Sequence, residues 1–212
     1  MSLGSRLLGD LAYLLGGSAV RRTLAMALPE RSAAERAAIA RASARLRMRR
    51  YFDPWARLDD VALCRRLSWE GAAPLRDARA APGALFLSAP LGVPELARRA
   101  VRIYCGDPAA RLVLLPTPSG VAPGGDARLP LLGRSVRSGA DWARAIGVPV
   151  FPIFATLEPG GRYRVELQHP LDPSGDDPDA LVCAAIARIE AAVAERPESW
   201  PWAEWAHQSP AR

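Results

Sequence analysis

The chain contains no lysine and no asparagine, and it has only two histidines and three cysteines. All 28 of its basic residues are therefore arginines. Cys64, Cys105 and Cys183 are odd in number and widely spaced, and no C-x-x-C pair is present. This pattern argues against a disulfide framework and against a cysteine-based zinc site. We expect three reduced thiols.

Long apolar runs are missing as well. The apolar stretch from Leu7 to Leu15 is nine residues long and contains Asp10, whereas a helix needs about 20 apolar residues to span a bilayer. No cleavage pattern follows it, so we expect neither a transmembrane helix nor a signal peptide. Half of the 212 residues are apolar, which is enough for one domain with a single core.

The net charge of +6 is concentrated near the N-terminus. Residues 1–50 hold ten arginines against Asp10, Glu30 and Glu35, a net charge of +7. Such a segment suits an anionic membrane surface, a nucleic acid or plain solvent. No nucleic-acid-binding motif accompanies it. We therefore expect an anionic membrane surface as a partner, and no nucleic acid.

Helical patterns fill residues 1–55. Five leucines between Leu7 and Leu15 form one stripe at helical spacing, and Gly16-Gly17 predicts the end of that helix. Pro29 predicts a second end, and Ser32 with Glu35 forms a capping box that opens a third helix. The expected helices are Ser5–Gly16, Ser18–Leu28 and Ser32–Arg50.

From residue 56 onward, short apolar segments alternate with helical ones, as in a sheet of parallel strands. The expected strands are Leu67–Glu70, Ala84–Ser88, Arg111–Leu115, Val148–Ala155 and Arg162–Gln168. The expected helices are Asp59–Leu67, Pro94–Tyr104, Ser138–Ile146 and Asp177–Arg196. We predict a single α/β domain with a mixed, largely parallel sheet flanked by helices. It consists of a basic, membrane-peripheral helical arm over residues 1–55 and an α/β unit over residues 56–212.

The segment from Gly83 to Ala97, GALFLSAPLGVPELA, has the build of an active-site corner. A short buried strand is followed by a tight turn through Pro90 and Gly92, and Pro94 stands where a helix begins. Glu95 then lies in the first helical turn. Because ligand sites in open α/β sheets lie beyond the carboxyl ends of the strands, we expect Glu95 at the mouth of a cleft.

Four segments in this order resemble the lipid A lauroyl/myristoyl acyltransferase family, a branch of the lysophospholipid acyltransferases. They are this corner, GVPVFPIF from Gly147, the triplet Gly161-Arg162-Tyr163, and PESWPW from Pro197. The resemblance implies transfer of a fatty acyl group to a lipid hydroxyl, without metal or another cofactor. The implied donor is an acyl carrier protein or acyl-CoA. The implied place is the cytoplasmic face of a bacterial inner membrane.

Members of this family carry a histidine base at the turn and a carboxylate five positions later. In this chain the carboxylate is Glu95, but Pro90 stands at the histidine position and cannot accept a proton. The two histidines, His169 and His207, are expected to face solvent, and Ser88 is not in a nucleophile elbow. Two hypotheses follow: a divergent acyltransferase with a lost or altered base, or a non-catalytic protein that binds an acyl chain, an acyl carrier protein or a membrane.

A second set of candidate residues resembles the family's turn before the helix that leads into the Pro-containing strand. A helix beginning near Ser138 offers free N–H groups, and Arg134 and Arg137 add fork-shaped donors for a phosphate. The alternative is a solvated basic turn. The candidate substrate-binding residues are Gly133, Arg134, Arg137, Ser138 and Gly139.

Trp200, Trp202 and Trp205 place three of the six tryptophans close to the C-terminus. Two roles are open for them: they cap the core, or they touch a membrane interface.

Overall fold

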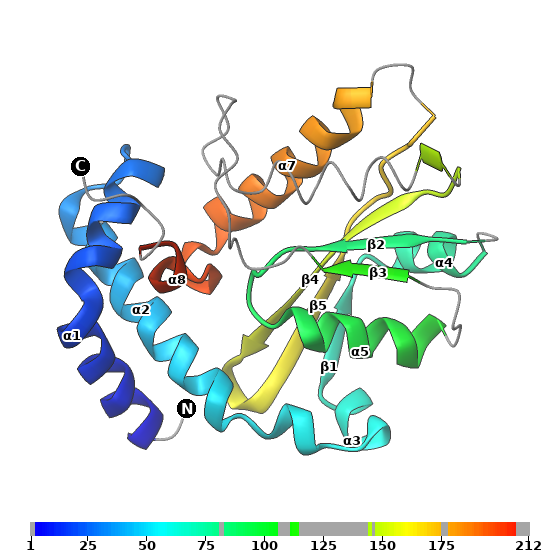
Figure 1. Cartoon of the computed structure of the whole chain (residues 1–212). Coiled ribbons are helices and arrows are strands. Elements are labelled where there is room, and N and C mark those ends of the chain that lie inside the picture. The colour runs from blue at the N-terminus through cyan, green and yellow to red at the C-terminus, as the bar shows by residue number, and fades with distance from the viewer. Residues whose placement is uncertain are drawn as a thin grey trace.

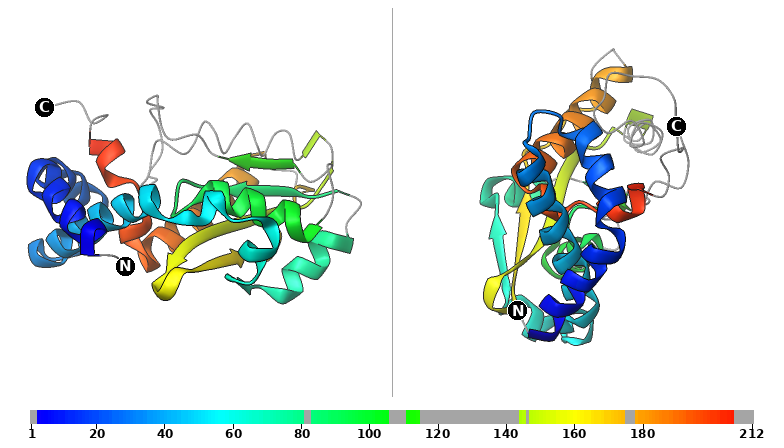
Figure 2. Two further views of the ribbon diagram at one scale, coloured as in Figure 1. Left: turned by 90° about the horizontal axis from the view of Figure 1, so that it is seen from below. Right: turned by 90° about the vertical axis from the view of Figure 1, so that its left-hand side faces the viewer.

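The computed structural model of the chain describes residues 3–80, 83–105, 111–114, 144–145, 147–174 and 178–206. A central sheet carries helices on both faces, and a pair of long helices closes one end of the molecule (Figures 1 and 2). The α-helices are α1 Leu3–Ala27, α2 Ala33–Phe52, α3 Asp60–Cys64, α4 Ala72–Ala80, α5 Pro94–Cys105, α7 Pro178–Glu195 and α8 Trp202–Ala206. Short 3-10 helices are η1 Pro54–Arg57, η3 Pro159–Gly161 and η4 Pro197–Ser199.

The strands are β1 Leu67–Glu70, β2 Leu85–Ser88, β3 Arg111–Leu114, β4 Val150–Glu158 and β5 Arg162–Leu167. They form one five-stranded sheet in the order β1-β5-β4-β2-β3. The neighbours pair in parallel, except that β4 and β5 form an antiparallel hairpin around η3. The predicted α/β class with a mixed, largely parallel sheet is confirmed. The prediction that β2, β3 and β4 are neighbours is also confirmed, since β2 lies between the other two.

Side chains alternate between two apolar layers, one on each face of the sheet. Leu85, Leu87 and Phe154 face a layer built with α1, α2, α7 and α8. Phe86 and Phe151 face the opposite layer, against α3 and α5. Strand β2 is therefore buried on both faces, which explains why its sequence is continuously apolar rather than alternating.

The tryptophans near the C-terminus belong to the first of these layers. Trp200 and Trp202 are completely buried, and the Trp202 indole N–H donates to the Pro197 carbonyl at 2.6 Å. For these two residues the core role is confirmed. The Trp205 side chain lies outside the described residues.

Two helix boundaries were predicted from specific residues near the N-terminus. The start at Ser32 agrees with the structure, and the end at Gly16-Gly17 does not. The capping box at Ser32 is formed as predicted: the Glu35 N–H donates to the serine hydroxyl at 3.2 Å, and the Ser32 N–H donates to the Glu35 carboxylate at 2.7 Å. The predicted helix end at Gly16-Gly17 is wrong, because α1 continues through both glycines. A Cβ on Gly17 would lie 2.8 Å from the Tyr13 ring, so this glycine serves close packing within a continuous helix.

The remaining differences are few. Strand β1 has the predicted bounds, and the other strands differ from prediction by one to three residues at an end. Helix α4, between β1 and β2, was not predicted. Of the helix predicted over Ser138–Ile146, the structure describes residues 144–145, which are helical.

Candidate functional site

The turn after β2 is held rigidly at the carboxyl end of the strand. Gly92 has φ of 71° and donates its N–H to the Ser199 carbonyl at 2.9 Å, and the Val93 N–H donates to the Ala155 carbonyl at 2.7 Å. A Cβ on Gly92 would lie 2.2 Å from the Ala155 oxygen. Only glycine satisfies both the positive φ and this close approach. The turn is therefore tied to β4 on one side and to η4 on the other.

Glu95 lies in the first turn of α5, as predicted, and Pro94 precedes it at the start of the helix. Its carboxylate is 3.4 Å from an Arg50 guanidinium nitrogen of α2, and 52% of the glutamate side chain is exposed. A solvent-exposed pair of this kind contributes little to stability, on the order of 0–1 kcal/mol. In an acyltransferase corner the carboxylate orients a histidine, whereas here it faces an arginine.

The candidates for a general base near the β2 turn are poorly placed. Pro90 is buried, and the buried Ser88 hydroxyl donates to the Ala89 carbonyl at 3.4 Å. His169 is exposed and lies two residues before Leu171, which bridges to Val150 at the start of β4. Because β4 runs parallel to β2, His169 lies near the amino ends of these strands, whereas the turn lies at the carboxyl end of β2. His207 lies outside the described residues.

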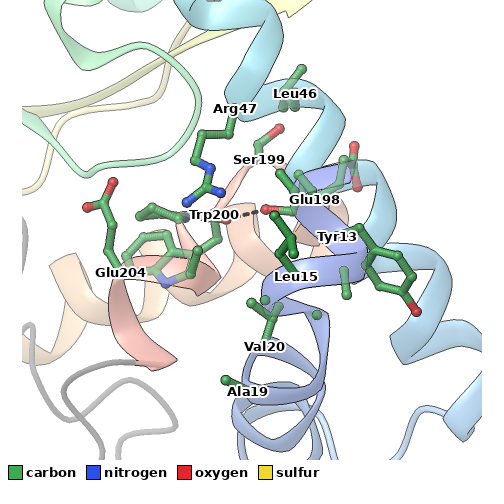
Figure 3. A pocket seen from close by; sticks show the side chains of 18 of the residues that line it. Tyr13, Leu15, Ala19, Val20, Leu46, Arg47, Glu198, Ser199, Trp200 and Glu204 are labelled. Carbon is green, nitrogen blue, oxygen red and sulfur yellow. Dashed lines mark hydrogen bonds between the residues drawn. The ribbon is translucent and has the colours of Figure 1, made fainter. Parts of the chain in front are cut away.

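A cavity of about 250 Å³ lies where α1, α2, η4 and α8 meet this turn (Figure 3). Its wall is mainly small or apolar, and Gly92 of the turn and Trp200 belong to it. Ser43 of α2 closes the wall by donating its hydroxyl to the Trp200 carbonyl at 3.1 Å. Glu95 is not among the lining residues, but its partner Arg50 is. The cavity is thus at the carboxyl end of β2, next to the predicted corner rather than at Glu95 itself.

Four charged side chains give the cavity its polar groups: Arg47 and Arg50 from α2, Glu198 from η4, and Glu204 from α8. The Arg47 side chain extends from α2 toward Trp200 (Figure 3). Its Nε is buried and has no hydrogen-bond partner within the described part of the chain. A buried donor without a partner is costly. Because Arg47 lines the cavity, its guanidinium is the candidate donor for an acceptor bound there.

The sequence did not single out Arg47 or this cavity. The lining comes from segments far apart in the chain, and each segment carries an ordinary local signal of helix or turn. The second predicted set, Gly133, Arg134, Arg137, Ser138 and Gly139, lies outside the described residues.

A separate buried polar cluster joins α2 to the sheet. The Tyr163 hydroxyl of β5 donates to the Asp53 carboxylate at 2.6 Å, and Asp53 also accepts from the Trp55 N–H at 3.1 Å. Burial of the phenol, followed by its bond to Asp53, raises the pKa of Tyr163 to about 12. This phenol therefore stays protonated at neutral pH and ties Asp53 in place.

Among the described residues, no group of histidine, cysteine or acidic side chains is arranged to hold a metal ion. No helix in the described part of the chain is long and apolar enough to cross a membrane. Neither the protein-family models nor the curated proteins contain a match to this chain.

Proposed function

We propose that the protein is a non-catalytic relative of the lauroyl/myristoyl acyltransferases that binds a single-chain anionic amphiphile, a fatty acyl compound, in the cavity beside the β2 turn. The observation that carries this proposal is the Arg47 side chain, which lines a wall of mostly small or apolar residues and whose Nε is a buried donor with no partner among the described residues. Pockets with an apolar lining and a few polar groups are typical of small-molecule sites.

The size of the cavity supports one chain rather than a larger lipid. Its volume of about 250 Å³ is below the range of roughly 300–1,000 Å³ that is usual for drug-sized ligands. An unbranched acyl chain fits such a space, whereas a glycolipid with several chains does not. Arg47 then meets the carboxylate or phosphate at the head of the chain through a charge-assisted bond.

Within the described ranges no general base lies near Glu95, and this supports binding without chemistry. Acyl transfer to a hydroxyl needs a group that takes the hydroxyl proton, and loss of such a base typically lowers the rate by about 10²–10⁴-fold. Pro90 has no side-chain group that can take a proton, His169 lies near the amino ends of β2 and β4, and Glu95 already faces Arg50.

The test combines binding and turnover. Laurate binding is measured by calorimetry for the wild type, for Arg47→Gln, and for Arg98→Gln, a matched change at an exposed arginine of α5. We expect Arg47→Gln to weaken binding by about tenfold or more, because a hydrogen bond to a charged group contributes roughly 1.5–3 kcal/mol. Arg98→Gln should bind like the wild type.

The second part of the test is an acyl-transfer assay with lauroyl-CoA as donor and a panel of lipids as acceptors. We expect no acyl transfer above background. Turnover by the wild type that Glu95→Ala abolishes would instead establish an active acyltransferase. Equal laurate affinity in the wild type and in Arg47→Gln would refute the assignment of the cavity.

A further inference from the structure

The first part of helix α1 has its leucine side chains on the outside. Leu7, Leu11, Leu14 and Leu15 are between 52% and 81% exposed, and Leu8 is 43% exposed. The buried side of the same helix is made largely of small residues, including Ser5, Gly9 and Gly17. A surface helix of a globular protein normally buries its large apolar side chains against the core.

The glycines explain how the helix packs without its leucines. A Cβ on Gly9 would lie 2.5 Å from the Arg45 Cα, so α1 and α2 approach each other closely along this side. The end view of the molecule shows α1 lying across its outer surface (Figure 2, right). The face formed by Leu7, Leu8, Leu11, Leu14 and Leu15, here called the leucine face, is therefore not covered by any part of the chain that the structure describes.

Exposed arginines and one carboxylate that is paired with an arginine lie near the leucine face. Arg6 precedes it, Arg22 lies on the same side two helical turns beyond Leu15, and both arginines are exposed. Asp10 is the one carboxylate of α1, and Arg45 of α2 holds it with two hydrogen bonds of 2.8 Å. The outer side of α1 thus combines apolar side chains with cations and offers no free anion.

We propose that α1 lies in the surface of an anionic lipid bilayer, with the leucine face among the acyl chains and Arg6 and Arg22 at the phosphates. Interfacial helices have this combination of an apolar face and basic residues, and they sit in the plane of the membrane rather than across it. The charge complementarity selects an anionic surface.

A second copy of the chain fits this face less well. The leucine face extends over about 12 Å of helix axis, whereas a stable protein–protein interface buries about 800 Å² on each partner. A symmetric contact would also bring the arginines of two copies together. A lipid surface has neither difficulty.

The experiment is flotation of the full chain with vesicles of phosphatidylcholine alone and of phosphatidylcholine with 30% phosphatidylglycerol. Leu7→Gln/Leu14→Gln changes two exposed leucines outside the cavity wall, and Val61→Gln is the control at an apolar residue of α3 that is 64% exposed. We expect binding to the anionic vesicles only. The double variant should weaken it by at least about tenfold, because two apolar side chains lose their burial, and Val61→Gln should not change it.

Raising the salt from 0.1 to 0.5 M should weaken binding further, because the charge contribution is screened. Binding that is equal on neutral vesicles, absent from both, or unchanged in the double variant would overturn the proposal. If sedimentation shows that the wild type is a dimer and that the double variant is a monomer, the leucine face would instead be the contact with a second copy. Laurate binding without vesicles tests the cavity separately, so the two proposals fail independently.

Discussion

Tyr163 shows how one side chain joins two parts of the chain. Its ring is completely buried in the layer that faces α3 and α5, and its hydroxyl donates to Asp53 at the end of α2. Asp53 is also 3.8 Å from the Arg49 guanidinium. The bond is therefore part of the contact between the N-terminal helices and the sheet.

The raised pKa of Tyr163 predicts how stability depends on alkaline pH. Its folded-state pKa is about 12, above the ordinary value of about 10 in an unfolded chain. The bond therefore stabilises the fold fully below pH 10, and this stabilisation is lost as the pH rises from 10 through 12. Urea unfolding of the wild type should show this loss between pH 9 and pH 12, and Tyr163→Phe should show less of it. Tyr51→Phe, at a tyrosine that is 76% exposed, should follow the wild type; identical slopes in all three proteins would contradict the prediction.

At the scale of elements, α1 shows why a periodic pattern identifies a helix but not its buried face. The leucine stripe was recognised from the sequence, yet nothing in it indicates that the glycine side packs against α2. The end predicted at Gly16-Gly17 failed for the same reason, because glycine was interpreted as a stop rather than as a packing residue. By contrast, the capping box and the apolar strands depend on neighbours in the sequence, and they were predicted closely.

Two glycines of α1 give a matched test of this packing. A methyl group on Gly9 meets the Arg45 backbone, whereas one on Gly16 meets nothing within 4 Å. Gly9→Ala should lower the free energy of unfolding by about 1–3 kcal/mol through overpacking. Gly16→Ala should raise it by about 0.5–1 kcal/mol, because alanine favours the helix. Thermal or urea unfolding measures both, and a loss of stability in both variants would show that α1 is not packed as described.

The candidate site shows the same division between local and distant contacts. The turn at Gly92 and the place of Glu95 followed from neighbouring residues, and both lie where the sequence predicted them. The cavity, and the position of Arg47 in its wall, exist only because α2, η4 and the β2 turn lie together in the folded chain. No local sequence pattern indicates that these segments are in contact.

For the whole molecule, the C-terminal segment joins the helices at one end to the sheet. Gly92 and Ser43 both bond to it, through the carbonyls of Ser199 and Trp200, and the two buried tryptophans complete the layer beneath α1. A chain ending at Arg196 should therefore lose cooperative unfolding and bind the dye ANS. Trp202→Phe keeps most of the ring and should unfold cooperatively at a lower temperature. Calorimetry distinguishes these cases, and a sharp transition in the shortened chain would show that the segment is dispensable.

The strand order has a consequence for how the protein is made. Strand β5 lies between β1 and β4 in the sheet, although it is the last of the described strands in the sequence. While the ribosome is still extending the chain, β1 has no neighbour, and α1 and α2 lack the tryptophans that complete their layer. Such non-local pairing makes folding slow and leaves apolar surface exposed in the meantime. The sheet is therefore completed only after β5 has been synthesised, and the layer beneath α1 only after Trp200 and Trp202 have followed.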